Sequence, residues 1–93
     1  MKALLPTGDP GEPVVVDDVP EPTPRPNEAL VKVEAFSVNR GETFKLEAPV
    51  PGERPGKDIA GLVVRPAADG SGPAGVVRVV GHPMAGGWAE FAA

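Results

Sequence analysis

The chain has 93 residues and a formal net charge of −4, with 13 prolines, 12 glycines and no cysteine. This length fits one small domain, and the absence of cysteine excludes disulfides and thiolate metal ligands. A mildly acidic chain without a cluster of Lys and Arg is not expected to bind nucleic acid. Since it has neither an apolar run of membrane-spanning length nor a secretion signal, we expect a cytoplasmic protein with no membrane contact.

The predicted elements are short and mostly strands. The many prolines and glycines disfavour long helices, and abundant valine with few aromatic residues favours a turn-rich, mainly β domain. Strands are predicted over residues 1–5, 14–16, 28–36, 59–64, 76–81 and 88–93. Alternating prolines in residues 19–27 predict an extended connector across the surface, with a disordered linker as the alternative. This set of strands suits a small barrel or a partly opened sandwich.

The most regular strand pattern leads directly into a polar turn. Val31, Val33 and Ala35 are predicted on one face of this strand, and the charged residues between them on the other. A short helix or helical turn is expected over residues 39–46. Asn39 suits its N-cap, because Glu42 follows at the spacing of a capping box.

Common catalytic and metal motifs are missing from the sequence. His82 is the only histidine and precedes a proline, so we interpret it as a solvated loop residue and expect no zinc site. Ser37 and Ser71 are the only serines, and neither lies in the Gly-x-Ser-x-Gly turn of a nucleophilic serine. The glycines around Ser71 lack the lysine of a phosphate-binding loop.

The polar turn after the third predicted strand carries the remaining candidate residues. The amide of Asn39 can donate and accept at once, which suits a carboxamide or a carbonyl group. Arg40 has a permanent charge suited to a phosphate or a carboxylate. The alternative is that Asn39 only caps the helix, with Arg40 and Glu42 as solvated surface residues.

A resemblance to a known family rests on several ordered sequence blocks. The blocks are Met1-Lys2-Ala3, Val31-Lys32-Val33-Glu34-Ala35 with Ser37-Val38-Asn39, Pro55-Gly56-Lys57-Asp58-Ile59-Ala60-Gly61-Leu62-Val63 and Gly86-Gly87-Trp88-Ala89-Glu90-Phe91. Together they resemble medium-chain dehydrogenases/reductases. The chain is most similar to the zinc-independent quinone oxidoreductase branch, which includes zeta-crystallin-like proteins.

The resemblance implies a GroES-like, partly open β-barrel over residues 1–93, with no Rossmann domain in this chain. The full enzymes continue into a Rossmann domain that binds NADPH. The implied function is the catalytic-side domain of an NADPH-dependent oxidoreductase that reduces quinones or activated double bonds of a small-molecule substrate. We expect the isolated chain to bind no cofactor and to be inactive. The alternatives are a free-standing GroES-like binding or assembly module, with homo-oligomers as one form, and an unrelated β domain.

The resemblance also implies roles for individual residues. Zinc-dependent relatives have Cys where this chain has Asn39 and a His-Glu pair where it has Lys57-Asp58, so zinc is not expected. Asn39 is implied to lie near the nicotinamide and the substrate, as a catalytic and cofactor-binding residue. Glu42 is a second catalytic candidate, and Phe44 is implied as an apolar wall of the substrate pocket. No role is assigned to Arg40.

Overall fold

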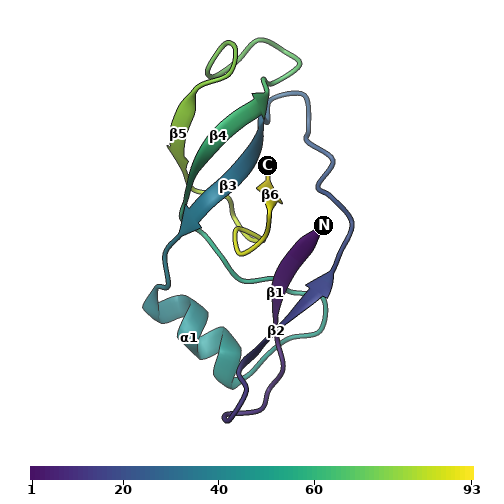
Figure 1. Cartoon of the computed structure of the whole chain (residues 1–93), viewed down its shortest axis with the longest axis vertical. Coiled ribbons are helices and arrows are strands. Elements are labelled where there is room, and N and C mark those ends of the chain that lie inside the picture. Colours follow the sequence, from purple (N-terminus) through teal and green to yellow (C-terminus); the bar gives the residue numbers. More distant parts are fainter.

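The structure, a computed structural model, describes all 93 residues of the chain. Its elements are β1 (Lys2–Pro6), β2 (Val14–Asp18), β3 (Leu30–Phe36), α1 (Arg40–Glu47), β4 (Ile59–Arg65), β5 (Arg78–Gly81) and β6 (Phe91–Ala92). β1 and β2 form one sheet, and a four-stranded sheet has the order β5-β4-β3-β6. Figure 1 shows α1 near the β1–β2 sheet, at the end of the molecule away from the β4–β5 loop.

The prediction of a mainly β fold with one short helix is confirmed. All strand pairs are antiparallel, and the strands do not close into a barrel. Each predicted strand is present, although β5 and β6 are shorter than expected. The helix α1 has eight residues, and the chain contains no helix with the length and apolar character that crossing a bilayer requires.

The segment before β6 joins the two sheets. On one side, Leu4 donates its backbone N–H to the carbonyl of Trp88 at 2.8 Å, and Glu90 donates to the carbonyl of Lys2 at 3.1 Å. On the other side, Val33 of β3 donates to the carbonyl of Glu90 at 2.8 Å. Residues 88–90 therefore lie between β1 and β3, and the strands β2 and β5 remain as open edges.

The connector between β2 and β3 is held at both ends by backbone hydrogen bonds. Val19 donates to the carbonyl of Met1 at 2.9 Å, and Asp69 donates to the carbonyl of Pro26 at 2.9 Å. Figure 1 shows this segment running along one side of the molecule, from the small sheet to the large one. These contacts agree with an ordered connector rather than a free linker.

A β-bulge at Glu34 ends the regular alternation of β3. Val33 pairs with Gly61 and Ala35 pairs with Ala60, so Glu34 is an extra residue opposite β4. Val31 is buried and Val33 is half-buried, but Ala35, predicted on the same face, is exposed, so the predicted alternation does not extend to Ala35. The physical reason is that a bulge bends its strand and breaks the two-residue repeat.

The core lies where β3, β4 and β6 meet. Val31, Ile59, Val63 and Ala92 form one buried cluster. Gly61 lies within this region, and a β-carbon there would stand 2.2 Å from the carbonyl oxygen of Lys32. Glycine therefore allows β3 and β4 to approach at this point.

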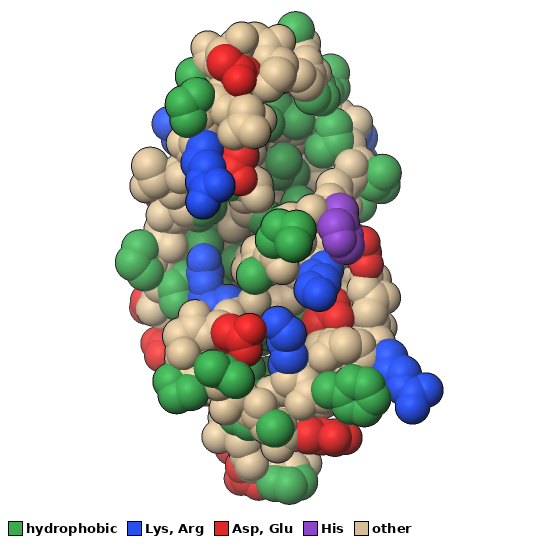
Figure 2. Space-filling view, turned by 180° about the vertical axis from the view of Figure 1, so that it is seen from behind, with side chains coloured by type: hydrophobic (Ala, Val, Ile, Leu, Met, Phe, Trp, Pro, Cys, Tyr) green, Lys and Arg blue, Asp and Glu red, His purple; other side chains and the backbone are tan.

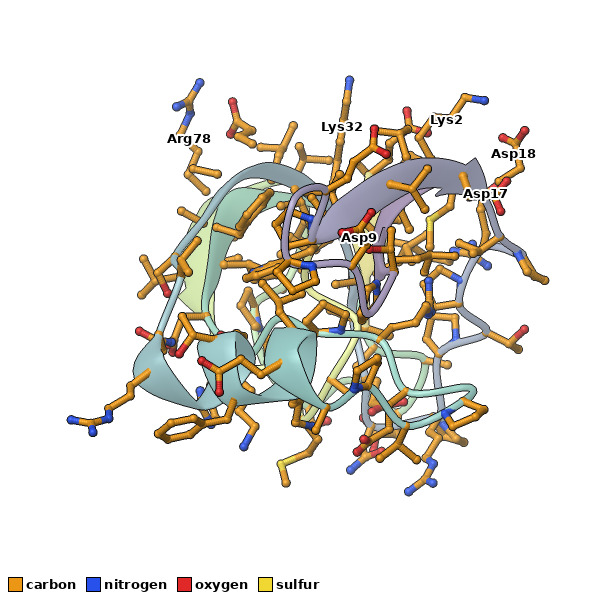
Figure 3. The ribbon with its side chains drawn as sticks, turned by 90° about the horizontal axis from the view of Figure 1, so that it is seen from below. Lys2, Asp9, Asp17, Asp18, Lys32 and Arg78 are labelled. Carbon is orange, nitrogen blue, oxygen red and sulfur yellow. The ribbon has the colours of Figure 1, made fainter.

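The outer side of the sheets is charged. In Figure 3, Lys2, Lys32 and Arg78 project from three strands on the side away from α1. Two ion pairs support this face: Lys2 with Asp18 at 3.0 Å, and Arg78 with Glu34 at 3.7 Å. Because these side chains are exposed, each pair contributes little to stability, but together they keep this face polar.

The close approach at Gly61 generates a stability prediction. We expect Gly61→Ala to lower the free energy of unfolding by about 2 kcal/mol or more, since the added methyl group overlaps backbone that cannot move freely. Gly41→Ala in α1 is the matched control, because no atom lies within 4 Å of its added β-carbon. We expect this change to stabilise the chain by about 0.5–1 kcal/mol in urea unfolding. Equal effects of the two substitutions would contradict the packing described here.

Candidate functional site

The candidate site forms at the sheet edge where β3 and β5 end and β4 begins. Phe36 of β3 pairs with Ile59 of β4, which pairs on its other side with Gly81 of β5. These three paired residues form a row across the sheet. Because neighbouring strands run antiparallel, the residue after Phe36, the residue before Ile59 and the residue after Gly81 all lie at the same sheet edge. These residues are Ser37, Asp58 and His82.

Asp58 is the centre of a polar network at this edge. Its Oδ1 lies 2.9 Å from Nδ1 of His82, and its Oδ2 accepts a hydrogen bond of 2.5 Å from Nδ2 of Asn39. The hydroxyl of Ser37 also donates to Oδ2, at 3.4 Å. One carboxylate thus contacts donors from the ends of β3 and β5 and from the start of α1.

Asn39 occupies the N-cap position of α1, as predicted, but its side chain does not cap the helix. It makes no hydrogen bond to a backbone N–H of the first turn, so the predicted capping box is not formed. Its Nδ2 instead contacts Asp58 and, at 3.4 Å, Oε1 of Glu42. The donor Nδ2 is turned toward these two carboxylates, and hydrogen bonds to charged acceptors are stronger than neutral ones, so this orientation is favoured over one that aims Oδ1 at the first turn.

Glu42 is the buried acidic residue of the network. Its exposed fraction is 2%, and it lies in the first turn of α1. The alternative in which Glu42 is a solvated surface residue is therefore excluded. A carboxylate at a helix N-terminus is favoured by the helix dipole, and the amide of Asn39 supplies its side-chain hydrogen bond.

Trp88 supports the end of β3, next to the polar network. It is 3% exposed, and its indole N–H donates to the carbonyl of Ser37 at 3.1 Å. Its ring packs on that of Phe36, with a centroid distance of 5.3 Å. These contacts hold the backbone from which Ser37 and Asn39 leave the sheet.

An open, mostly apolar hollow of about 460 Å³ adjoins the network. Its lining residues are Ala35, Phe36, Ser37, Asp58, Ile59, Ala60, Val80, Gly81 and His82. The His82 side chain is 63% exposed, and Figure 2 shows the single histidine at the surface with an acidic side chain against it. An apolar cavity with a few polar groups at one end is the usual form of a small-molecule site.

The network holds the pKa of Asp58 below its ordinary value of 3.8. The hydrogen bond with His82 is the largest cause, followed by the bond from Asn39, while desolvation acts in the opposite direction. The lowered pKa keeps Asp58 ionised, and therefore able to accept hydrogen bonds, over a wider pH range.

The structure brings together only part of the predicted site. Asn39 and Glu42 are in contact, but Phe44 is 54% exposed and does not line the hollow. Its ring instead contacts Arg40, whose Cζ lies 5.5 Å from the ring centroid. The proposed role of Phe44 in substrate binding therefore stays a prediction, and Arg40 gains a contact but no functional role.

Asp58 and His82 were not predicted as site residues. His82 is indeed exposed, but it is paired with Asp58 rather than free in a loop. A signal was present in the sequence, because Asp58 precedes one apolar strand and His82 follows the next. In an antiparallel hairpin these two positions meet at one edge.

Comparison with known proteins gives one similarity. Over 53 residues the chain is 43% identical to the trans-enoyl reductase RAP2 of Pyricularia oryzae. The match covers 56% of this chain but 15% of that enzyme. No protein-family model and no solved structure matches the chain. The similarity supports a relationship to reductases in broad terms, over a small part of the enzyme.

The lowered pKa of Asp58 can be measured directly. In an NMR titration of the side-chain carboxyl carbon, we expect a midpoint below 3.8. The substitution His82→Phe should move it upward, because the main stabilising hydrogen bond is lost. Since folding depresses this pKa, its contribution to stability is present above the unfolded value of about 3.9 and is lost as the pH falls through the folded pKa. An unchanged midpoint in His82→Phe would refute the pairing.

The bridging role of Asn39 gives another prediction. Asn39→Ala removes the donor shared by two carboxylates and should lower the free energy of unfolding by about 1 kcal/mol. Asn39→Asp should cost more at pH 7, because it places a third negative charge beside Asp58 and Glu42. Urea unfolding measures both changes, with the exposed Asn27→Ala as control. If Asn39→Asp were as stable as the unchanged chain, the amide would not bridge these carboxylates.

Proposed function

We propose that this chain is the substrate-side domain of an NADPH-dependent reductase acting on an activated carbon–carbon double bond or a quinone. The observation that carries the proposal is the 43% identity over 53 residues to a trans-enoyl reductase. The GroES-like character of the domain is part of this proposal. The ordered sequence blocks and the antiparallel, mainly β fold support it. A cytoplasmic location also remains a prediction.

The orientation of Asn39 suits a role beside a carboxamide. Both of its contacts, Asp58 and Glu42, are carboxylates that accept hydrogen bonds when ionised, so the amide nitrogen must face them. The side-chain oxygen Oδ1 then remains as an acceptor. In our proposal it accepts a hydrogen bond from the nicotinamide carboxamide, while Asp58 and Glu42 hold the amide through Nδ2.

The proposal assigns cofactor binding to a separate nucleotide-binding domain. This chain has no parallel strand pair, whereas dinucleotides are usually bound at parallel βαβ units. When bound, NADPH supplies the hydride for the reduction. The proposal includes no zinc, since no three side chains of the types that usually bind metals are grouped to hold an ion.

A domain exchange tests this function. The part of the Pyricularia oryzae enzyme that corresponds to this chain, namely the 53 matched residues with their flanking segments, is replaced by the chain, and NADPH oxidation is followed with a crotonyl thioester. We expect the chimera to reduce the thioester and Asn39→Ala to lower kcat/KM by about tenfold or more, which corresponds to about 1.4 kcal/mol of lost transition-state stabilisation.

The isolated chain is the control for the exchange experiment. It should neither bind NADPH at submillimolar concentration nor reduce the thioester. A folded but inactive chimera would reject the reductase function. Cofactor binding by the isolated chain would show that the assignment to a separate domain is wrong.

A binding or assembly module is the second candidate function. The open edges of the two sheets carry exposed valines, with Val16 on β2 at 61% and Val80 on β5 at 86%. Unpaired edge strands can pair with another chain. Sedimentation of the purified chain distinguishes the two candidate functions. A stable dimer that is disrupted by Val16→Lys or Val80→Lys would favour the module.

A further inference from the structure

The hollow beside the polar network has apolar walls and a polar end. Phe36, Ile59 and Val80 belong to its walls, and Val80 is 86% exposed. Ser37, Asp58 and His82 supply its polar side chains. The single O–H of Ser37 already donates to Asp58, and an ionised carboxylate has no donor, so among these three side chains only His82 can offer a further donor to a ligand.

The contact with Asp58 determines which nitrogen of the His82 ring carries a proton. An ionised carboxylate only accepts hydrogen bonds, so Nδ1 of His82 carries a proton in the 2.9 Å contact. Nε2 is therefore the free nitrogen of an imidazole that is 63% exposed. It has a lone pair when the ring is neutral and an N–H when the ring is protonated.

The charges around His82 select the type of ligand. Asp58 contacts the ring directly, and Glu42 joins the same network through Asn39. Lys57 precedes Asp58 and is exposed, while Arg78, at the far end of β5, is paired with Glu34. A negatively charged ligand would be repelled by Asp58, so a neutral oxygen acceptor fits better. The aromatic wall of Phe36 favours a flat group.

We propose that the hollow binds the carbonyl end of a neutral conjugated ketone or enoyl thioester, and that Nε2–H of protonated His82 donates a hydrogen bond to the carbonyl oxygen. Asp58 is then a positioning residue that orients the ring and holds a proton on Nδ1. The ligand class rests on the function proposed above, whereas the role of His82 rests on the geometry of this site. The sequence blocks do not include His82.

Binding by the whole chain tests the assignment, using crotonyl N-acetylcysteamine thioester as the probe. Titration followed by NMR should shift the ring nitrogens of His82 and the backbone signals of Ala60 and Val80. Because only the protonated ring offers Nε2–H, affinity should rise as the pH is lowered. At pH 8 the NMR signals of the ring nitrogens should also show that the proton of neutral His82 is on Nδ1 rather than on Nε2. Asp58→Asn should weaken this preference for Nδ1.

Three variants separate the role of His82 from a general effect on folding. His82→Phe should weaken binding at low pH on the order of tenfold, the loss expected for one hydrogen bond from a charged donor. His82→Gln keeps a neutral N–H donor, so it should still bind the probe but lose the pH dependence. Met84→Ala is the control, because Met84 is 81% exposed and lies outside the hollow.

Each outcome supports or rejects the assignment. Absence of binding at millimolar probe would reject it, as would equal affinities of the unchanged chain and His82→Phe at low pH. The result is independent of the exchange experiment. Binding that depends on His82, together with an inactive chimera, would reject the reductase function but not this site. An active chimera with binding unaffected by His82→Phe would reject this site alone.

Discussion

The packing of Trp88 is the constraint on which the rest of the structure depends. Its backbone carbonyl accepts from Leu4 of β1, and its backbone N–H donates to Pro55. Its side chain packs on Phe36 and donates to Ser37. One buried residue thus connects the small sheet, the loop before β4 and the end of β3. With few fully buried side chains elsewhere, Trp88 and the neighbouring backbone hydrogen bonds of Glu90 hold the two sheets as one unit.

The polar network follows from that connection. The end of β3 is held by Trp88, and the pairing of β4 with its two neighbours then fixes where Ser37, Asp58 and His82 emerge. Each hydrogen bond within the network is exposed or only partly buried and contributes modestly. Their common acceptor, Asp58, makes them act as a unit, since a change in one donor alters the carboxylate that the others use.

The fold was largely predictable from local patterns, and the site only in part. Alternating valines indicated β3, and the spacing of Asn39 and Glu42 indicated the start of α1. The bulge at Glu34 was not predicted, because pairing with β4 determines it rather than the sequence of β3 alone. His82 was missed for a related reason. Its partner is 24 residues away, and only the register of the sheet brings the two together.

The polar network is built from residues next to three different strands, and this limits where the chain can gain or lose residues. Ser37, Asp58 and His82 meet because each is one residue beyond a paired row. A residue inserted between Asp58 and the paired Ile59 would move Asp58 out of line with Ser37 and His82. The same insertion in the exposed turn at residues 51–53, or in the glycine-rich loop before β5, would leave the row intact. Variation in length should therefore be confined to these loops, while the spacing within the strands is preserved.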